Sequence, residues 1–400
     1  MELLIDPETQ ALADRVRRFI DTEVIPREPL ATHPDGWPPE VWAEVRAAAK
    51  AAGVWAPQLP RELGGLGLTL SQCAPVFEAA GRSLLGPGAL NCAAPDEGNL
   101  HLLERYATPA QRERYLLPLA AGMIRSAFAM TEPAPGAGSD PTMIRTQATR
   151  RGQRWVINGH KWFVTGADGA AFVIVMARTN PDVPASEGCT LFLVDADHPG
   201  LQLVRRIPGL GAHLPGGHCE LRLVACEVGD EAVLGPVNRG FALTQQRLGP
   251  ARLTHCMRWI GAAQRALEIA TARAREREAF GAPLAQHQAV QWMLADSEID
   301  LHAARLMVLH AAALIDHGDE ARRETSICKV FVAEAVNRVI DRAVQICGAL
   351  GIAHDLPLAT MYAEARAFRI YDGASEVHRM VIARQVLRAA ARQAAAADQS

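Results

Sequence analysis

Apolar residues recur at helical spacing in the first part of the chain, up to about Gly122. Leu12, Val16 and Ile20 fall on one face of a helix, because steps of three or four residues bring side chains to the same side. Clusters of proline and glycine interrupt the pattern and mark turns. We therefore expect residues 1–125 to form an all-α domain.

From about Ala127 to Val237 the pattern changes to short runs rich in β-branched and aromatic residues. The clearest runs are 155–157, 171–176, 189–194 and 221–224. Asn158-Gly159 is typical of a tight hairpin and predicts a turn at that point. Several short strands without an intervening helical pattern predict a small antiparallel β-barrel or sandwich in residues 126–238.

Helical spacing returns near Phe241 and continues to Leu387 in longer stretches. Short loops that contain Gly318 or Gly348 connect these stretches, which favours antiparallel neighbours and a helix bundle in residues 239–400. The expected fold class is α+β, with the β-domain between two helical domains. The pattern contains no Rossmann unit, so we expect any dinucleotide to bind between domains.

Composition limits the function. The 400 residues suffice for two or three domains, and 49 % hydrophobic with 21 % charged residues is ordinary for a globular enzyme. A net charge of -3 gives no basic field, so nucleic acid is a poor candidate partner. No apolar run is long enough for a membrane span. The first residues have neither secretory-signal nor transit-peptide character, and we expect a cytoplasmic protein.

Cysteine and histidine positions give little sign of a metal site. None of the eight cysteines forms a Cys-x-x-Cys pair, which predicts reduced, mostly buried thiols. His213, His218 and Cys219 are grouped in a segment rich in glycine and proline. That segment is more typical of a turn between strands, so we expect no bound metal.

An acidic residue followed by glycine, Asp372-Gly373, stands between two helical runs. A carboxylate at such a junction can act as a general base, because the loop directs it and the helices fix it. Ser375 and Glu376 can open the following helix. An isolated Asp-Gly pair is more often a solvated turn, and the pair alone leaves both interpretations open.

Five segments, in order and spacing, resemble the acyl-CoA dehydrogenase family. They are residues 130–140, 158–166, 277–281 with 287–288, 345–351 and 371–373. The likeness extends from near the N-terminus to about Arg388. The resemblance implies an N-terminal helical domain, a middle β-domain and a C-terminal four-helix bundle. It also implies bound FAD and a homotetramer or homodimer.

The same resemblance implies an activity, FAD-dependent α,β-dehydrogenation of an acyl-CoA thioester to trans-2-enoyl-CoA in fatty acid metabolism. A base removes the α-proton, flavin N5 accepts the β-hydride, and electron-transfer flavoprotein accepts the electrons. Two alternatives stay open. One is a flavin oxidase of this fold that uses oxygen and acts on acyl-CoA or nitroalkanes. The other is a non-catalytic flavoprotein that binds a macromolecule.

Asp372 takes the position of the catalytic base, where most family members carry glutamate. Aspartate is one methylene shorter, but a subgroup of the family carries it in a similar Tyr-Asp-Gly setting. Some members place the base immediately before an arginine, and here that position is Ala251, which cannot accept a proton. Arg252 resembles the residue that anchors the base-bearing loop and the thioester. Thr254 and His255 are compatible with an unusual or hydroxylated substrate, or with simple packing.

The resemblance also assigns flavin and substrate contacts. Phe128, Met130 and Thr131 correspond to the stretch along the flavin ring edge. Phe163 and Thr165 are the expected flavin contacts of the next strand, and Trp162 replaces Phe163 if the strand register differs. Ser139 and Gly373 correspond to substrate contacts, although Ala134-Pro135 is inserted relative to the common pattern ahead of Ser139.

A second set of residues corresponds to contacts with the FAD pyrophosphate and adenosine, in part from a neighbouring subunit. The set comprises Arg277, Phe280, Gln288, Gln345, Gly348, Ser375 and Glu376. Arginine suits phosphate because its donors form a planar fork, and glycine lets the backbone approach closely. Ser375 and Glu376 are equally consistent with a role at the helix N-terminus.

Overall fold

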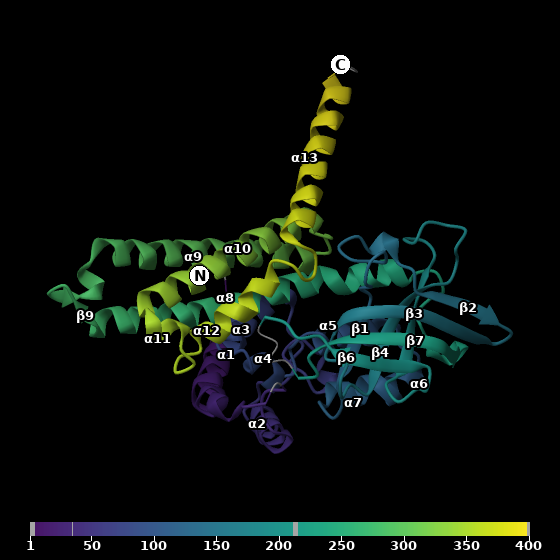
Figure 1. The fold of residues 1–400 in the computed structure, drawn as a ribbon. Helices are drawn as coiled ribbons and strands as arrows, with labels where there is room; N and C mark the ends of the chain where they lie inside the picture. Colours follow the sequence, from purple (N-terminus) through teal and green to yellow (C-terminus); the bar gives the residue numbers. More distant parts are fainter. Residues whose placement is uncertain (1–4, 34, 211–214, 398–400) are drawn as a thin grey trace. The chain divides into compact units, whose positions relative to one another are not determined.

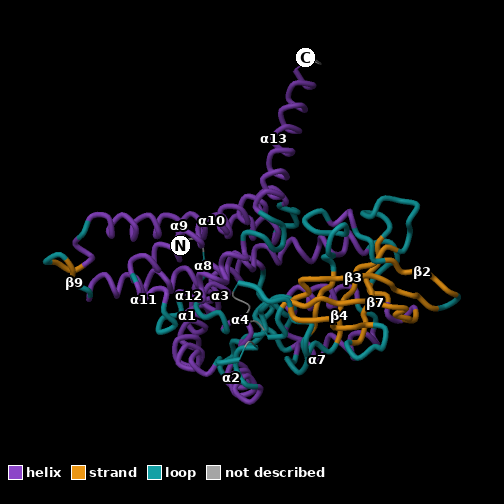
Figure 2. The backbone as a smooth tube through the Cα atoms, in the orientation of Figure 1, coloured by secondary structure: helices purple, strands orange, loops and turns teal. Residues whose placement is uncertain are grey.

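The computed structural model describes residues 5–33, 35–210 and 215–397, and the chain divides into two compact units. The helical unit contains the residues up to 20, residues 69–86 and those from 252 onward. The sheet unit contains residues 21–68 and 87–251. Figures 1 and 2 show the helices and strands of each unit.

The sheet unit is built on one eight-stranded sheet, drawn in orange in Figure 2. Its strands are β1 (Ser126–Ala129), β2 (Gln147–Arg151), β3 (Arg154–Thr165), β4 (Phe172–Arg178), β5 (Cys189–Asp195), β6 (Leu201–Arg206), β7 (His218–Gly229) and β8 (Val233–Leu234). The order is β6-β7-β3-β2-β4-β5-β8, with β1 beside β4. The first six residues of β4 and of β5 are buried, because uninterrupted apolar runs fill the middle of the sheet.

The expected β-domain between two helical regions is confirmed, but its pairing is not wholly antiparallel. β1 pairs with β4 in parallel, and β2 also meets β4 in parallel. Neither pair is joined by a tight turn, and strands joined by longer crossovers can run parallel. The remaining pairs are antiparallel.

The hairpin predicted at Asn158-Gly159 is wrong, because both residues lie inside β3. A register shift against β7 occurs between Ile157 and Gly159, and Asn158 Oδ1 accepts the Ala225 N–H at 2.8 Å. A Cβ on Gly159 would stand 2.3 Å from Thr146 Oγ1. The glycine therefore permits a close approach inside an irregular strand, a signal that resembles a turn in sequence.

Short helices precede the sheet along the chain. They are α2 (Pro39–Ala51), α4 (Gly86–Ala89), α5 (Asp96–Tyr106), α6 (Pro109–Gln111) and α7 (Leu117–Ala120). Helix α5 is tied to the first residue of β1, because the Asp96 carboxylate accepts the Ser126 N–H at 2.8 Å. Asn99, one turn later on α5, donates to Ser126 Oγ at 2.9 Å. These bonds set where β1 begins.

The helical unit is built from the remaining helices. They are α1 (Pro7–Phe19), α3 (Leu70–Gly81), α8 (Gly240–Glu276), α9 (Gln288–Asp316), α10 (Arg322–Cys347), α11 (Ala349–Ile352), α12 (Leu358–Phe368) and α13 (Ser375–Ala397). Among them are the four longest of the helices described, α8, α9, α10 and α13. The first turns of α8 belong to the sheet unit. Figure 1 shows α9 and α10 side by side, with α13 projecting from the bundle. Within the described residues, no helix is long and apolar enough to cross a membrane.

Polar caps and small residues fix the ends and contacts of these helices. Asp6 caps α1 by accepting the Thr9 N–H at 2.9 Å. The Asp316 carboxylate at the end of α9 accepts the first two N–H groups of α3, each at 2.9 Å. A Cβ on Gly261 of α8 would stand 1.9 Å from the Glu78 carbonyl of α3. Glycine at this position lets the two helices touch and so fixes the rotation of α8.

The predicted turn glycines adopt left-handed conformations. Gly318 follows α9 with φ 88°, and Gly348 follows α10 with φ 63°. Between α8 and α9 the chain forms a small antiparallel pair, β9 (Glu278–Ala279) with β10 (Ala282–Pro283). The tight connections make consecutive helices antiparallel neighbours, as the sequence predicts.

Candidate active site

The candidate base, Asp372, lies in the short loop between α12 and α13. Its φ is 54° and that of Gly373 is 97°, so two successive residues take left-handed conformations. Aspartate tolerates this region better than most residues, and glycine enters it without steric cost. A Cβ on Gly373 would stand 2.6 Å from His378 Nε2. Position 373 therefore needs glycine for its backbone angle and for space.

The carbonyl of Asp372 is held from two helices. Arg252 Nε on α8 donates to it at 2.9 Å, and His378 Nε2 on α13 lies 3.1 Å from it. Burial lowers the pKa of His378 to about 4, with the charge of Arg252 acting in the same direction. The neutral ring therefore donates through Nε2, and Nδ1 accepts from the Ser326 hydroxyl at 3.1 Å.

Lys329 of α10 lies beneath this loop with none of its side chain exposed. Its Nζ donates to the Phe368 carbonyl at 2.6 Å and lies 3.5 Å from that of Gly373. The ammonium also stands 4.2 Å from the centre of the Phe368 ring. No carboxylate of the described residues lies within ion-pair distance of it, and burial lowers the pKa of Lys329 to about 8.

The carboxylate of Asp372 faces a histidine of α8. Its Oδ2 lies 3.2 Å from His255 Nε2, and the two side chains are 20 % and 14 % exposed. Burial lowers the pKa of His255 to about 4, and the positive charge of Arg258 adds to this effect. The imidazole is therefore neutral near pH 7. An ionised carboxylate only accepts hydrogen bonds, so the ring proton is on Nε2.

Aromatic rings enclose the His255 imidazole. The Tyr371 ring lies 4.8 Å from it and the Phe368 ring 6.1 Å from it, centre to centre. Trp259 Nε1, one turn further along α8, donates to the Tyr371 hydroxyl at 2.6 Å. Arg252, His255 and Trp259 share one face of α8, because steps of three and four residues align side chains.

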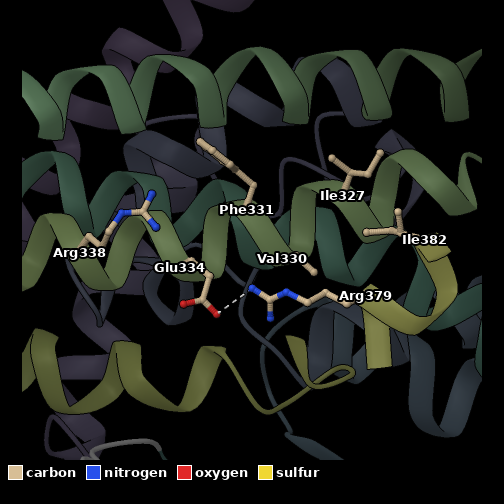
Figure 3. A pocket seen from close by; sticks show the side chains of 7 residues that line it. All are labelled: Ile327, Val330, Phe331, Glu334, Arg338, Arg379 and Ile382. Carbon is tan, nitrogen blue, oxygen red and sulfur yellow. Dashed lines mark ion pairs between the residues drawn. The ribbon is translucent and has the colours of Figure 1, made fainter. Parts of the chain in front are cut away.

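Both ends of the loop are tied to Glu334 of α10. Its carboxylate lies 2.8 Å from an Arg369 nitrogen and accepts from Ser375 Oγ at 3.1 Å. Arg379 lies 3.9 Å from it, and Figure 3 shows these two side chains facing each other. They line a groove of about 320 Å³ between α10 and α13, with Ile327, Val330, Phe331, Arg338 and Ile382. The side chain of Glu376, in contrast, is 80 % exposed.

In the sheet unit, Phe128 of β1 packs against an arginine, and Met130 and Thr131 follow the end of the strand at Ala129. The Arg247 guanidinium of α8 stands 4.4 Å from the centre of the Phe128 ring. Lys161 Nζ donates to the Met130 carbonyl at 2.9 Å. The Thr131 carbonyl accepts the Trp162 N–H at 3.0 Å. The segment after β1 is therefore held directly against β3.

A buried ion pair fixes this segment. Lys161 Nζ lies 2.9 Å from Glu132 Oε1, and the side chains are 0 % and 3 % exposed. The Glu132 carboxylate also accepts the N–H groups of Arg145 at 2.7 Å and Thr146 at 2.9 Å. Burial alone would raise the pKa of Glu132, but the Lys161 ammonium and the Thr146 donors outweigh it and hold that pKa below its usual value.

The expected flavin contacts of β3 flank a bulge. Phe163 has φ 49° and is 50 % exposed, whereas Val164 is buried. The register against β7 shifts between Lys161 and Val164, so one extra residue enters β3 there. Thr165 Oγ1 lies 3.0 Å from His218 Nδ1. Phe163 and Thr165 both lie on the less buried side of β3.

The remaining predicted positions of the sheet unit are less constrained. Ser139 is exposed in the loop after β1 that also contains Ala134-Pro135. His213, one member of the sequence cluster considered for a metal, lies outside the described residues. Among the described residues no group of three or more His, Cys, Asp or Glu could hold a metal ion.

Five of the seven predicted pyrophosphate and adenosine contacts lie at one end of the helical unit, where α8 and α10 end and α9 begins, whereas Ser375 and Glu376 begin α13 beside the Asp372 loop and Ser375 is buried. Arg277, Gln288, Gln345 and Gly348 are exposed, and Phe280 is 97 % exposed. Arg273, on the last turn of α8, has a buried Nε without a hydrogen-bond partner in the described part of the chain. A Cβ on Gly348 would meet nothing within 4 Å. Exposed polar donors, a bare aromatic ring and open backbone suit a phosphate-bearing aromatic cofactor.

The structure brings some predicted residues together and adds others. Arg252, Asp372 and Gly373 meet in the helical unit. Sequence reasoning missed Lys329, His378 and Glu334, and it gave His255 no specific role. The one available signal was spacing, because His255 follows Arg252 by three residues on the same helix. The partners of Lys329 and Glu334 are far away in sequence, whereas His378 lies six residues after Asp372.

Comparisons with protein families agree along almost the whole chain. Residues 6–123, 127–226 and 238–387 match the models "Acyl-CoA dehydrogenase, N-terminal domain", "middle domain" and "C-terminal domain", respectively. The chain is similar to "Probable acyl-CoA dehydrogenase FadE2" of Mycobacterium tuberculosis, with 44 % identity over 354 residues that cover 87 % of this chain and 86 % of that protein.

Longer proteins and a solved structure are also similar. "Acyl-CoA dehydrogenase family member 10" of Mus musculus is 38 % identical over 96 % of this chain, but the match spans only 37 % of the mouse protein. The chain likewise spans about half of family member 11 proteins. A Mycobacterium abscessus structure assigned to the acyl-CoA dehydrogenases has a TM-score of 0.90 and 40 % identity, covering 96 % of this chain and 99 % of that one.

Proposed function

The chain belongs to the acyl-CoA dehydrogenase family and is a flavoprotein oxidoreductase, and from this premise we propose that it uses FAD to convert an acyl-CoA thioester to the trans-2-enoyl-CoA. Asp372 removes the proton from the carbon next to the thioester carbonyl. FAD, when bound, supplies the N5 atom that accepts the β-hydride. The proposed domains are residues 1–125, 126–238 and 239–400.

The observation that carries this proposal is the restraint on Asp372. Its carbonyl accepts a hydrogen bond from Arg252, and its carboxylate faces His255. The Asp372 side chain is only 20 % exposed. A base fixed in this way abstracts a proton from a bound thioester with little loss of conformational entropy, because it is already oriented. Asp372 ends the step as a carboxylic acid, and the electron pair of the broken C–H bond enters the new double bond.

We assign FAD contacts to residues of each unit. Phe128, Met130, Thr131, Phe163 and Thr165 would contact the flavin ring system. Arg277, Phe280, Gln288, Gln345, Gly348, Ser375 and Glu376 would hold the pyrophosphate and adenosine, in part for a neighbouring subunit. Support comes from the exposed Phe280 ring and from the buried Arg273 Nε that lacks a partner among the described residues. Ser139, Arg252 and Gly373 would contact the acyl-CoA.

Exposed apolar side chains support the proposed homo-oligomer. Trp292 and Ile299 are spaced seven residues apart on α9 and are 61 % and 66 % exposed. Leu387 on α13 is 69 % exposed. Side chains of this size seldom gather on helices that face only water. We propose a homotetramer or homodimer, and light scattering on the purified protein tests it.

The electron acceptor and location follow from the same premise. We propose electron-transfer flavoprotein as acceptor and the cytoplasm as location. All eight cysteines are buried thiols outside any disulfide, which is typical of a chain in a reducing compartment. The oxidase alternative predicts rapid release of hydrogen peroxide from the reduced enzyme in air, and the dehydrogenase predicts slow release.

The decisive experiment replaces the proposed base. In Asp372→Asn we expect FAD to stay bound, while its anaerobic reduction by an acyl-CoA slows by on the order of 10²–10⁴-fold, because an amide cannot accept the α-proton. The measurement is bleaching of flavin absorbance across a panel of acyl-CoA thioesters. Asp355→Asn, an exposed acid in the loop before α12, is the matched control and should behave as wild type. Unchanged bleaching in Asp372→Asn would remove Asp372 as the base.

A further inference from the structure

Hydrogen bonds to its backbone restrain the loop that bears Asp372, and a side-chain contact also acts on the carboxylate itself. That contact is with His255, whose Nε2 lies 3.2 Å from Oδ2. Arg252 and His378 both bond to the backbone carbonyl of Asp372, and these two bonds do not involve the side-chain carboxylate. Backbone restraint leaves the side-chain torsions of an aspartate free to rotate.

We propose that His255 is a positioning residue for the catalytic carboxylate, a neutral hydrogen-bond donor whose Nε2–H holds Asp372 Oδ2 and thereby fixes the plane of the acid. The inference rests on the proposed function, in which Asp372 is the base. It adds a role to a histidine that neither the family models nor the names of the relatives assign.

The surroundings of His255 are built to hold the ring still. Tyr371 packs against it, and the Tyr371 hydroxyl is itself fixed by the Trp259 N–H at 2.6 Å. The backbone of His255 is in the middle of α8, whose rotation is set by the contact of Gly261 with α3. A ring with two fixed neighbours on a rigid helix loses little further entropy when it binds the carboxylate.

The charge state of the ring suits a donor and not a counter-ion. The titratable and charged groups around it are Arg252 and Arg258 of α8, Lys329 of α10, Tyr371 and Asp372 of the loop, and His378 of α13. Burial, Arg258 and Lys329 all disfavour the imidazolium, and Asp372 alone favours it. A neutral donor orients the carboxylate without adding a full positive charge that would weaken it as a base.

Substitution separates donation from packing and from proton transfer. His255→Leu removes the donor, and His255→Gln keeps an N–H near the place of Nε2. We expect flavin reduction to slow by about 10–100-fold in His255→Leu, since a misplacement of about 1 Å costs up to 10²-fold. We expect His255→Gln to stay within a few-fold of wild type. Substrate affinity should change little in either variant.

The pH profile distinguishes positioning from a structural role. A carboxylate that loses a donor holds its proton more readily, so in His255→Leu the acid limb of the rate should move to higher pH. In His255→Gln the limb should stay in place. Met257→Ala serves as the packing control, because Met257 is buried on the same helix beside Glu78 and Arg305. Met257→Ala should lower the unfolding temperature but leave the rate of flavin reduction and the acid limb of its pH profile unchanged.

A second measurement isolates proton removal. 3,3-Dimethylbutanoyl-CoA has α-hydrogens but no β-hydrogen, so exchange of its C2 protons in D₂O reports on the base without hydride transfer. The expected order of exchange rates is wild type and His255→Gln first, then His255→Leu, then Asp372→Asn.

Three results would overturn the inference. A His255→Leu variant with wild-type rate and pH profile would show that the contact is idle. A slow variant with an unmoved acid limb would indicate packing alone. A His255→Gln variant as slow as His255→Leu would indicate that the ring accepts protons, since an amide donates but cannot accept them. Wild-type exchange in Asp372→Asn would instead remove the proposed function.

Discussion

The two units each bury a lysine completely, and they treat its charge in opposite ways. Lys161 in the sheet unit meets Glu132 at 2.9 Å, and both side chains are almost fully buried. Lys329 in the helical unit meets backbone carbonyls and the face of Phe368, with its pKa lowered to about 8. A buried charge that is paired with a counter-charge can hold two segments together. A buried charge that meets only carbonyls and aromatic rings lowers the stability of the fold, so we expect it to have a functional role.

The two lysines therefore have different jobs. Lys161 and Glu132 tie β3 to the segment that carries Met130 and Thr131, so their loss should be felt first in folding. Lys329 binds the carbonyl of Phe368 at the end of α12 and approaches that of Gly373 just after Asp372. Its loss should be felt first in the position of the base.

Breaking the paired lysine should have the largest effect on stability. Glu132→Gln leaves a buried ammonium without its counter-charge, and we expect the free energy of unfolding to fall by about 3–5 kcal/mol. Urea denaturation followed by circular dichroism measures it. Glu187→Gln, an exposed acid of the same unit, is the control and should change stability by less than about 0.5 kcal/mol. A loss below about 1 kcal/mol for Glu132→Gln would mean that the pair is not needed.

Removing the other lysine should mainly affect the rate. In Lys329→Met the carbonyls lose a donor, but a costly buried charge also disappears, so we expect stability to change by less than about 1.5 kcal/mol. The loop should loosen, and flavin reduction should slow by about 10–100-fold. Stopped-flow reduction and urea unfolding of the same preparation give both numbers. The contrast between the lysines fails if Lys329→Met destabilises the fold as strongly as Glu132→Gln and leaves the rate intact.

A smaller effect extends the comparison to histidines. His101 of the sheet unit resembles His255 in that burial lowers its pKa to about 4, but its Nε2 has no partner within the described residues. The unfolded chain takes up a proton near pH 6.5, and the folded chain does so only near 4. Stability from this group is therefore lost as pH falls from about 6.5 to 4.

Replacing this histidine should make the sheet unit less sensitive to acid. We expect His101→Leu to gain about 2 kcal/mol relative to wild type on going from pH 7.5 to pH 5, because leucine cannot take up the proton. Thermal unfolding at the two pH values measures the difference. An equal change in both proteins would show that His101 does not contribute to the acid sensitivity.

Periodicity was sufficient for the architecture. Helical spacing predicted the long elements α9 and α10, and Gly318 and Gly348 end them in the left-handed conformation that glycine permits. The hairpin prediction at Asn158-Gly159 failed because asparagine and glycine occur both in tight turns and in strand bulges. The contact with Thr146, which distinguishes the two cases here, is not visible in the sequence.

The immediate surroundings of Asp372 were predictable only in part. Arg252 was expected near the loop through the resemblance, and its Nε does bond to the Asp372 carbonyl. Lys329 and His378 read as ordinary polar residues of amphipathic helices, because nothing local indicates that they face inward. The contacts of Lys329 with Phe368 and of His378 with Ser326 cross long sequence separations, 39 and 52 residues. Such contacts are set by packing and not by local pattern.

The left-handed backbone of Asp372 restricts which acids this position accepts. At φ 54° a side chain pays a conformational cost of roughly 1 kcal/mol that asparagine and aspartate bear most easily. Replacing Asp372 by glutamate would thus lengthen the side chain that carries the carboxylate and also raise the conformational energy of the turn. In this protein the backbone conformation at position 372 therefore helps to determine which acid serves as the base. A redesign that changes this acid would first have to change the turn.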